Sequence, residues 1–345
     1  MTLQQLLRTD LPVIQAPMAG VQGSALAVAV CSAGGLGSLP CAMLGPAVLR
    51  DELAALTAGA QGRPFNVNFF CHRPATPDAA REAAWRAALL PYYREFGIDP
   101  AAIAPGPARA PFGDESATLV EAFRPAVVSF HFGLPAPELL ARVKASGAKV
   151  LASATTVEEA LWLESRGVDA VIAQGVEAGG HRGMFLANDL TTQIGTLALV
   201  PQIVRAVRLP VIAAGGIADA RGVAAALALG AMAVQVGTAY LLCPEATTSA
   251  VHRAALASEA ARHTALTTLF TGRPARAVVN RLMNELGPLN PLAPEFPLAV
   301  AALAPLRATA EGRGSGDFSP LWCGQNASGC SHLPAAELTR ALASA

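Results

Sequence analysis

A unit made of a short apolar run, a turn and a helical stretch recurs along most of this chain and constrains its fold more than any other feature. Eight apolar runs are strand candidates, nearly all alternating with helices: Pro12 to Pro17, Leu36 to Pro40, Phe65 to Phe70, Ala126 to Phe132, Lys149 to Ala154, Ala170 to Gln174, Pro210 to Gly215 and Ala233 to Thr238. Parallel strands need crossover helices, and eight of them close a sheet. The repeat therefore predicts an α/β fold, a (β/α)8 TIM barrel.

An open, doubly wound sheet is the competing arrangement. It would be favoured by a Gly-x-Gly-x-x-Gly turn after the first strand, but that turn reads PMAGVQG, from Pro17 to Gly23. The GGLG at Gly34 to Gly37 precedes a strand and fits a helix end. A charge-free stretch, Val223 to Cys243, is interpreted as a buried helix followed by a strand, because Gly230 and Gln235 divide it.

Two regions interrupt the repeat. A long insert between Cys71 and Ser116 contains one expected helix, Asp78 to Phe96. After the eighth strand, a helical stretch from Thr247 to Ala261 leads into two β-like runs between Ala265 and Asn280. We therefore expect a barrel over residues 1–240, a small α+β cap domain inserted after the eighth strand over residues 241–301, and a segment over residues 302–345 that returns to the barrel.

Composition and charge exclude several classes of function. The chain is 52% hydrophobic and 14% charged, with 25 basic and 25 acidic residues, so it is globular and lacks the basic surface that nucleic acids require. Its six cysteines form no C-x-x-C pair, and its start, MTLQQLLRTD, lacks a basic region followed by an apolar one. We expect a cytoplasmic protein without a metal site. The sequence leaves open whether it is a monomer or a homodimer.

Reactive groups of such barrels lie at the C-terminal ends of the strands. Here those positions are Ala16 to Met18, Asn68, His131, Ser153, Gln174, His181, Gly215, Gly216 and Gln235 to Thr238. None is an Asp, a Glu or a Lys. A carboxylate pair, a carboxylate metal site and a Schiff-base lysine are therefore disfavoured.

The stretch QGVEAGGHRG, from Gln174 to Gly183, combines backbone flexibility with one imidazole. This combination suits the flat ring of a cofactor with a proton-transfer group, His181, aimed at it. His131, in SFHFG, is the rival base and is otherwise expected in the substrate pocket. Glu177 is interpreted as a loop residue, and the sequence gives Arg182 no role.

Two glycine turns, Ala213 to Ile217 and Gln235 to Thr238, occupy the strand ends at which barrels usually bind phosphate. The amides of Asn68 and Gln174 match the donor and acceptor edge of a flavin pyrimidine ring. These features together favour a mononucleotide flavin as cofactor.

The chain resembles the class I nitronate monooxygenases, formerly called 2-nitropropane dioxygenases. The resemblance rests on LPVIQAPMAG (Leu11 to Gly20), AGGLGSLP (Ala33 to Pro40), PFNVNFFCH (Pro64 to His72), SFHFGLP (Ser129 to Pro135), DAVIAQGVEAGGHRG (Asp169 to Gly183), AAGGI (Ala213 to Ile217), QVGTAYL (Gln235 to Leu241) and PLWCGQ (Pro320 to Gln325). It implies an FMN-dependent barrel that oxidises alkyl nitronates of the propionate 3-nitronate type with O2 to carbonyl compounds and nitrite or nitrate.

The resemblance also implies roles for single residues. His181 matches the catalytic histidine of the family. Together with the strand-end argument, the resemblance gives as expected FMN-binding residues Ala16, Pro17, Met18, Asn68, Gln174, Gly179, Gly180, Gly215, Gly216, Gln235, Val236, Gly237 and Thr238. The substrate pocket is expected to contain His131, Trp322 and Gln325.

Similar glycine loops and histidines occur in other enzymes of this fold. The alternative function is an NAD(P)H-dependent FMN reductase that acts on quinones or enoyl thioesters. A flavin-storing protein without turnover is a third possibility, which no feature of the sequence favours.

Overall fold

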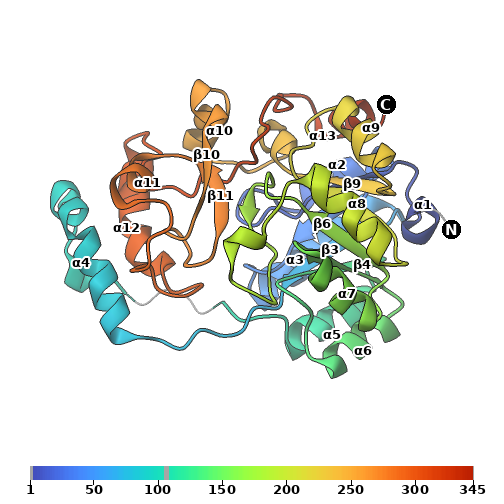
Figure 1. Cartoon of the computed structure of the whole chain (residues 1–345), viewed down its shortest axis with the longest axis horizontal. Coiled ribbons are helices and arrows are strands. Elements are labelled where there is room, and N and C mark those ends of the chain that lie inside the picture. Colours follow the sequence, from blue (N-terminus) through green and yellow to red (C-terminus); the bar gives the residue numbers. More distant parts are fainter. Residues whose placement is uncertain (1–2, 105–108, 345) are drawn as a thin grey trace.

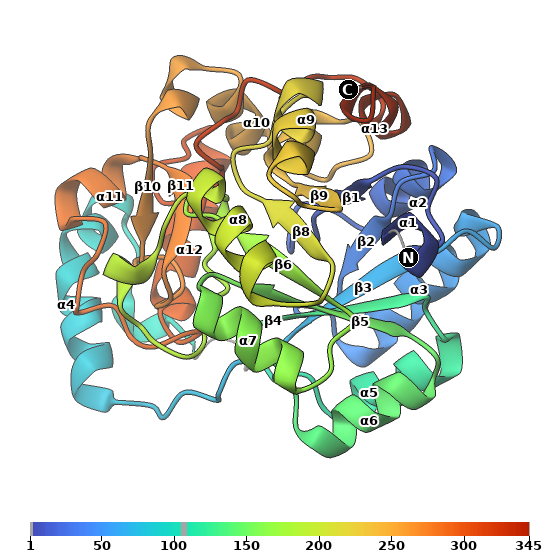
Figure 2. The same ribbon diagram turned by 45° about the vertical axis from the view of Figure 1, so that its right-hand side comes forward.

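The computed structural model describes residues 3–104 and 109–344. Eight strands form one parallel sheet in the order β1-β9-β8-β6-β5-β4-β3-β2. They are β1 (Val13–Gln15), β2 (Gly37–Pro40), β3 (Phe65–Phe70), β4 (Val127–His131), β5 (Lys149–Ala154), β6 (Ala170–Gln174), β8 (Val211–Ala214) and β9 (Ala233–Val236). Each lies within one of the predicted runs, and the predicted TIM barrel is confirmed (Figures 1 and 2).

Helices cover the outside of the barrel and form the other part of the molecule. Their bounds are α1 (Leu3–Leu7), α2 (Ser24–Ser32), α3 (Pro46–Ala60), α4 (Ala79–Phe96), α5 (Asp114–Phe123), α6 (Pro137–Ala145), α7 (Val157–Ser165), α8 (Thr196–Ala206), α9 (Ala220–Ala228), α10 (Ala250–Leu256), α11 (Arg281–Leu286), α12 (Val300–Gly312) and α13 (Ala335–Leu342). The charge-free stretch is the helix α9 followed by β9, as predicted. No helix in the described part of the chain combines the length and apolar character that crossing a bilayer requires.

Successive side chains along each strand point to opposite faces of the sheet, and this alternation divides the core into two layers. In β6, Ala170 and Ile172 pack inside the barrel, whereas Val171 and Ala173 pack against the surrounding helices. All five residues of this strand are buried. This burial on both faces explains why the strands read as continuous apolar runs in the sequence.

The barrel is closed between β1 and β2 mainly by side chains. Backbone pairing there is a single bridge between Ile14 and Leu36. Beside it, the side chain of Gln15 accepts a hydrogen bond from the backbone N–H of Ser38 at 3.0 Å and donates to Gln22 at 2.6 Å. Gln22 in turn donates to the carbonyl of Ser38 at 2.6 Å. Two glutamine amides thus replace the missing rungs of the ladder.

A smaller antiparallel sheet lies over the C-terminal ends of the barrel strands. It contains β10 (Thr264–Thr267), β11 (Ala275–Val278) and β7 (Gly180–His181), in the order β10-β11-β7. The first two strands match the β-like runs predicted after the barrel. The third was not predicted, and it joins the glycine-rich loop to this sheet through the pair His181 and Ala275.

The insert after β3 and the region after β9 share a second hydrophobic core. Helix α4 contributes Trp85, Leu89 and Tyr93, which pack against residues from the region 269–318. The hydroxyl of Tyr93 donates to the carbonyl of Ala302 in α12 at 2.7 Å. Figure 1 shows α4 beside α11 and α12, at the opposite end of the molecule from α13. The division of the chain at residues 240 and 301 remains a prediction.

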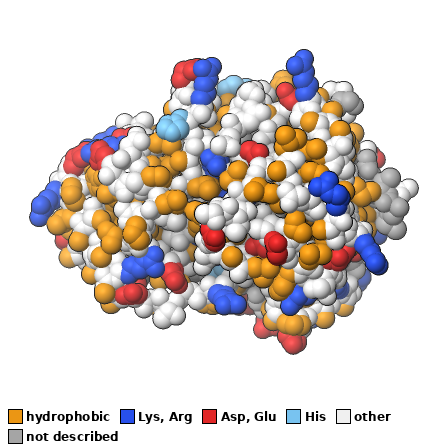
Figure 3. Space-filling view, viewed as in Figure 1, with side chains coloured by type: hydrophobic (Ala, Val, Ile, Leu, Met, Phe, Trp, Pro, Cys, Tyr) orange, Lys and Arg blue, Asp and Glu red, His pale blue; other side chains and the backbone are white. Residues whose placement is uncertain are grey.

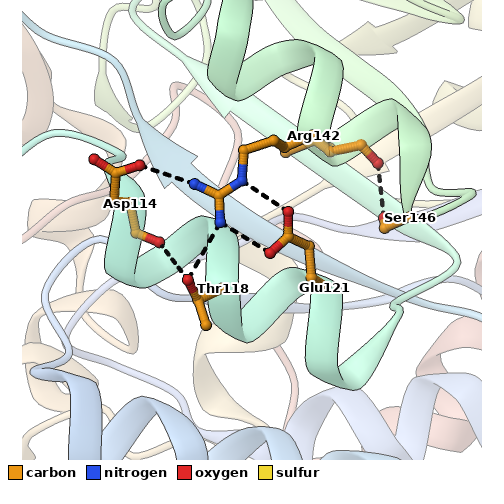
Figure 4. Close-up of polar contacts among 6 residues, drawn as sticks. Asp114, Thr118, Glu121, Arg142 and Ser146 are labelled. Carbon is orange, nitrogen blue, oxygen red and sulfur yellow. Dashed lines mark hydrogen bonds and ion pairs between the residues drawn. The ribbon is translucent and has the colours of Figure 1, made fainter.

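A network of exposed charges joins two neighbouring helices of the barrel. Arg142 of α6 donates to both carboxylate oxygens of Glu121 in α5, at 2.7 and 2.8 Å, and to Asp114 at 2.8 Å (Figure 4). This network attaches α5 to α6. On the face drawn in Figure 3, basic and acidic side chains are interspersed, and no area of one sign stands out.

We predict that Leu89→Ala lowers the free energy of unfolding by about 2–5 kcal/mol, because it leaves a cavity in the second core. Ala87→Ser, an exposed change on the same helix, should lower it by no more than about 0.5 kcal/mol. Denaturant titration followed by circular dichroism measures both. Equal effects would show that α4 does not need the second core.

Candidate active site

A cavity of about 460 Å³ lies at the C-terminal ends of the barrel strands. Of the residues predicted for the site, it is lined by Ala16, Pro17, Met18, Asn68, His131, Gln174, Gly179, Gly180, His181, Gly215, Gly216, Gln235, Gly237, Thr238 and Trp322. Two others do not line it. Val236 is buried in the core around the barrel, and Gln325 is exposed, with its backbone N–H bonded to the carbonyl of Glu177 at 2.9 Å.

His181 stands on the cavity wall with one ring nitrogen bound and the other free. Its Nε2 lies 2.9 Å from the hydroxyl oxygen of Thr271. Its Nδ1 has no hydrogen-bond partner within residues 3–104 and 109–344. Aromatic rings surround it, with the centroids of Phe296 and Trp322 both 5.4 Å away and that of Phe132 at 5.9 Å. The imidazole is therefore held in an apolar wall with one nitrogen available for a ligand.

His131 has both ring nitrogens bound by the protein. Its Nε2 lies 3.1 Å from the carbonyl oxygen of His181, which can only accept, so Nε2 carries the proton. Its Nδ1 then accepts from the hydroxyl of Ser153 at 2.9 Å. His131 supports the loop that bears His181. Of the two histidines weighed as a base, this geometry favours His181.

Both imidazoles are neutral near pH 7. Burial lowers the pKa of His181 well below its ordinary value near 6.5, and nearby His131 and Arg273 lower it further. Burial likewise lowers the pKa of His131 to about 3. No carboxylate pairs with either ring in the described residues. The site therefore disfavours a positive charge on His181 and favours a ligand that carries a negative charge.

Two arginines that sequence reasoning left without a role hold the loop from Gln174 to His181. Arg182 is fully buried and donates to the carbonyl oxygens of Gln174 and Gly175, both at 2.7 Å. Arg276 donates to the carbonyl of Val176 at 2.8 Å. An arginine fork is the side chain best suited to binding several carbonyls at once. In the sequence, the only indication of a role for Arg182 was its position directly after His181. That position does not show whether the arginine is a buried hydrogen-bond donor or a solvated surface charge.

Glu177 caps a helix. Its carboxylate accepts from the backbone N–H and from the hydroxyl of Thr196, both at 2.9 Å, at the first turn of α8. A negative charge is favourable at a helix N-terminus. The structure thus makes this loop residue a structural acceptor with no proton-transfer role.

Two glycines of the loop are required by close packing, and a glycine of the turn after β8 is required by its backbone conformation. A Cβ on Gly175 would lie 2.0 Å from the hydroxyl oxygen of Thr196, and one on Gly179 would lie 2.6 Å from the backbone nitrogen of Gly324. Gly216 has a φ of +73°, which side-chain-bearing residues rarely adopt. Larger residues at these positions would displace the backbone that borders the cavity.

The amides at the strand ends line the cavity and also have partners in the protein. Gln174 donates to the carbonyl of His181 at 3.0 Å and accepts from the N–H of Gly183 at 2.7 Å, so it holds the loop. Asn68 donates to Ser129, which leaves its carbonyl oxygen without a partner in the described chain. The side-chain oxygen of Gln235 is buried and unpaired among the described residues. Two acceptors on the cavity wall thus fit a ligand that carries an N–H donor, as a flavin pyrimidine ring does.

Known proteins resemble the chain over nearly its whole length. The family model described as nitronate monooxygenase matches residues 1–344. Nitronate monooxygenases of Paraburkholderia phytofirmans and Pseudomonas aeruginosa are 45% and 46% identical to it, covering 99% and 98% of this chain and 93% and 97% of their own.

Solved structures give the same result. Nitroalkane oxidase from Streptomyces ansochromogenes is 39% identical, with a TM-score of 0.89 over 99% of this chain and 96% of that one. FabK from Thermotoga maritima is more distant, at 27% identity and a TM-score of 0.72 over 99% of this chain and 94% of that one. The matching family model, together with these relatives, shows that the chain belongs to the nitronate monooxygenase family.

Proposed function

We propose that this protein is an FMN-dependent nitronate monooxygenase, which oxidises an alkyl nitronate with O2 to a carbonyl compound and nitrite or nitrate. The carrying observation is His181, whose imidazole is neutral and has a free Nδ1 on the wall of a cavity bordered by glycines. Membership of the family implies a flavin. The location we propose is the cytoplasm, which suits the six free cysteines.

The residues present fit FMN. The turn at Gly215 and Gly216 and the turn at Gly237 and Thr238 border one side of the cavity, where backbone N–H groups can hold a phosphate. The free oxygens of Gln235 and Asn68 would accept from the pyrimidine ring. The bound flavin supplies electron acceptance and reaction with oxygen.

The protein favours a substrate that is already anionic. A nitronate has lost its α-proton and needs no base, whereas a neutral nitroalkane must lose that proton first. The lowered pKa of His181 leaves the imidazole unprotonated and able to accept a proton, but it also weakens it as a base. Phe296 and Trp322 pack against the ring. We therefore assign His181 two roles: it orients nitronates and serves as a weak base toward nitroalkanes.

His181→Asn should reduce kcat/KM for a nitroalkane by about 100-fold or more, since a general base contributes roughly that much. The loss for the corresponding nitronate should be at least tenfold smaller, at about 10-fold or less. Oxygen uptake with both forms of the same compound gives the two values. Equal losses would reject the assignment of His181 as base.

The pH profile tests the lowered pKa of His181. Because the ring is protonated only when the pH falls to that lowered pKa, kcat/KM for a nitronate should stay constant within about twofold from about pH 6 to 8. A histidine with an ordinary pKa would instead titrate near 6.5. A clear inflection at that pH, seen in stopped assays with a stable nitronate, would contradict the neutral assignment.

Reduction by NADH distinguishes the proposed function from the alternative, an NAD(P)H-dependent FMN reductase. The likeness to FabK at 27% identity is the reason to test this alternative. Under anaerobic conditions NADH should leave the oxidised flavin absorbance unchanged over the time of one turnover, while dithionite bleaches it as a positive control. Rapid bleaching by NADH would favour a reductase and reject the monooxygenase proposal.

A further inference from the structure

Arg109 places an unpaired positive charge on the cavity wall. Within residues 3–104 and 109–344 its guanidinium has no hydrogen-bond or ion-pair partner. Among the residues that the structure describes, one carboxylate lines the cavity, that of Glu311, and it is already bound by Arg307 at 2.8 Å and by Ser319 at 2.6 Å. Burial lowers the pKa of Arg109, as expected for a cation with no counter-charge. A partly buried cation without a partner costs free energy, which an anionic ligand would offset.

The position of Arg109 separates it from the phosphate turns. Its carbonyl accepts from Nε2 of His72 at 2.9 Å, and Phe112 donates to the carbonyl of Phe70 at 2.8 Å, so this segment follows the end of β3. The proposed phosphate turn at Gly215 follows β8. These two strands are four places apart in the eight-stranded order, on opposite sides of the barrel. Arg109 is thus not needed to neutralise the FMN phosphate.

The same side of the cavity carries His181 and a second cation. Arg109 and His181 line the same cavity, and the ring of Phe70, at the end of β3, lies 6.3 Å from that of His181. The charges of Arg109 and Arg273 both contribute to the lowering of the pKa of His181. Arg273 lies over the ring of Phe132, 3.9 Å from its centroid, and has no carboxylate partner in the described chain. Arg109 also borders a second cavity, with Trp85 and Pro297, so this residue lies where the two cavities meet. A substrate held at His181 would extend toward it.

We propose that Arg109 is a specificity-determining residue, which binds a carboxylate on the substrate at the end remote from the nitronate. This inference rests on the proposed function, whose substrates already include nitronates of the propionate 3-nitronate type, and it names the side chain that would select them. Arginine binds carboxylates through two parallel hydrogen bonds, which favours such a substrate over an uncharged one of equal length.

Arg109→Gln tests the inference with propionate 3-nitronate and butyl-1-nitronate, which differ mainly in the carboxylate. In the holoenzyme, kcat/KM for the first should fall about 10- to 100-fold, mostly through KM, because a charge-assisted pair is lost. The value for the second should change less than about threefold. The ratio of the two values is independent of the amount of folded enzyme, so partial unfolding does not obscure the result. Arg109→Lys should restore part of the ratio.

Arg86→Gln is the matched control. Arg86 borders only the second cavity, and its guanidinium donates to the carbonyl of Pro100 at 3.3 Å. The ratio should stay unchanged in this variant. If Arg109→Gln also leaves the ratio unchanged while wild-type enzyme turns over both nitronates, the role of Arg109 in binding the carboxylate is rejected and the proposed function stands.

Binding of succinate and butyrate separates the two proposals. Calorimetry on the holoenzyme should show tighter binding of succinate, by about tenfold, and Arg109→Gln should remove the difference. If wild-type enzyme oxidises no nitronate, the proposed function fails, and a succinate preference that depends on Arg109 still supports the anion site. Equal binding of succinate and butyrate by wild-type protein would overturn the proposal that Arg109 binds a carboxylate.

Discussion

The site depends on two buried arginines that bind backbone carbonyls. Arg182 and Arg276 together hold three consecutive carbonyl oxygens, those of residues 174–176, and neither arginine forms an ion pair in the described chain. Burying a cation is costly unless its donors are satisfied, and here neutral dipoles satisfy them. The loop from Gln174 to His181 can consequently keep a shape that its three glycines alone would not maintain, and this shape sets the position of His181.

The fold could be predicted from the regular alternation of apolar runs and helical stretches in the sequence. Apolar runs between helices predicted every barrel strand, since strands buried on both faces leave an unmistakable pattern. Helix α5 was not predicted, because its start lies in the polar end of a long insert. The association of α4 with α12 could likewise not be predicted, since no local sequence pattern shows which distant helix Trp85 will contact.

The candidate site was predictable where it depends on strand ends and much less where it depends on side-chain partners. Most of the expected residues line one cavity, as the barrel rule requires. Gln174 lines this cavity, and its amide also holds the loop, which the sequence did not indicate. Thr271 and Arg109 could not be found, because the segments that carry them reach the site from outside the barrel repeat.

Sharing a core between distant segments has a consequence for how the chain is made. Tyr93 and Ala302, which join α4 to α12, are 209 residues apart in sequence. During synthesis from the N-terminus, the apolar face of α4 emerges long before its partners and stays without cover until most of the barrel has been translated. The barrel can fold first, so the aromatic wall beside His181, which includes Phe296 and Trp322, is completed only when the last third of the chain leaves the ribosome.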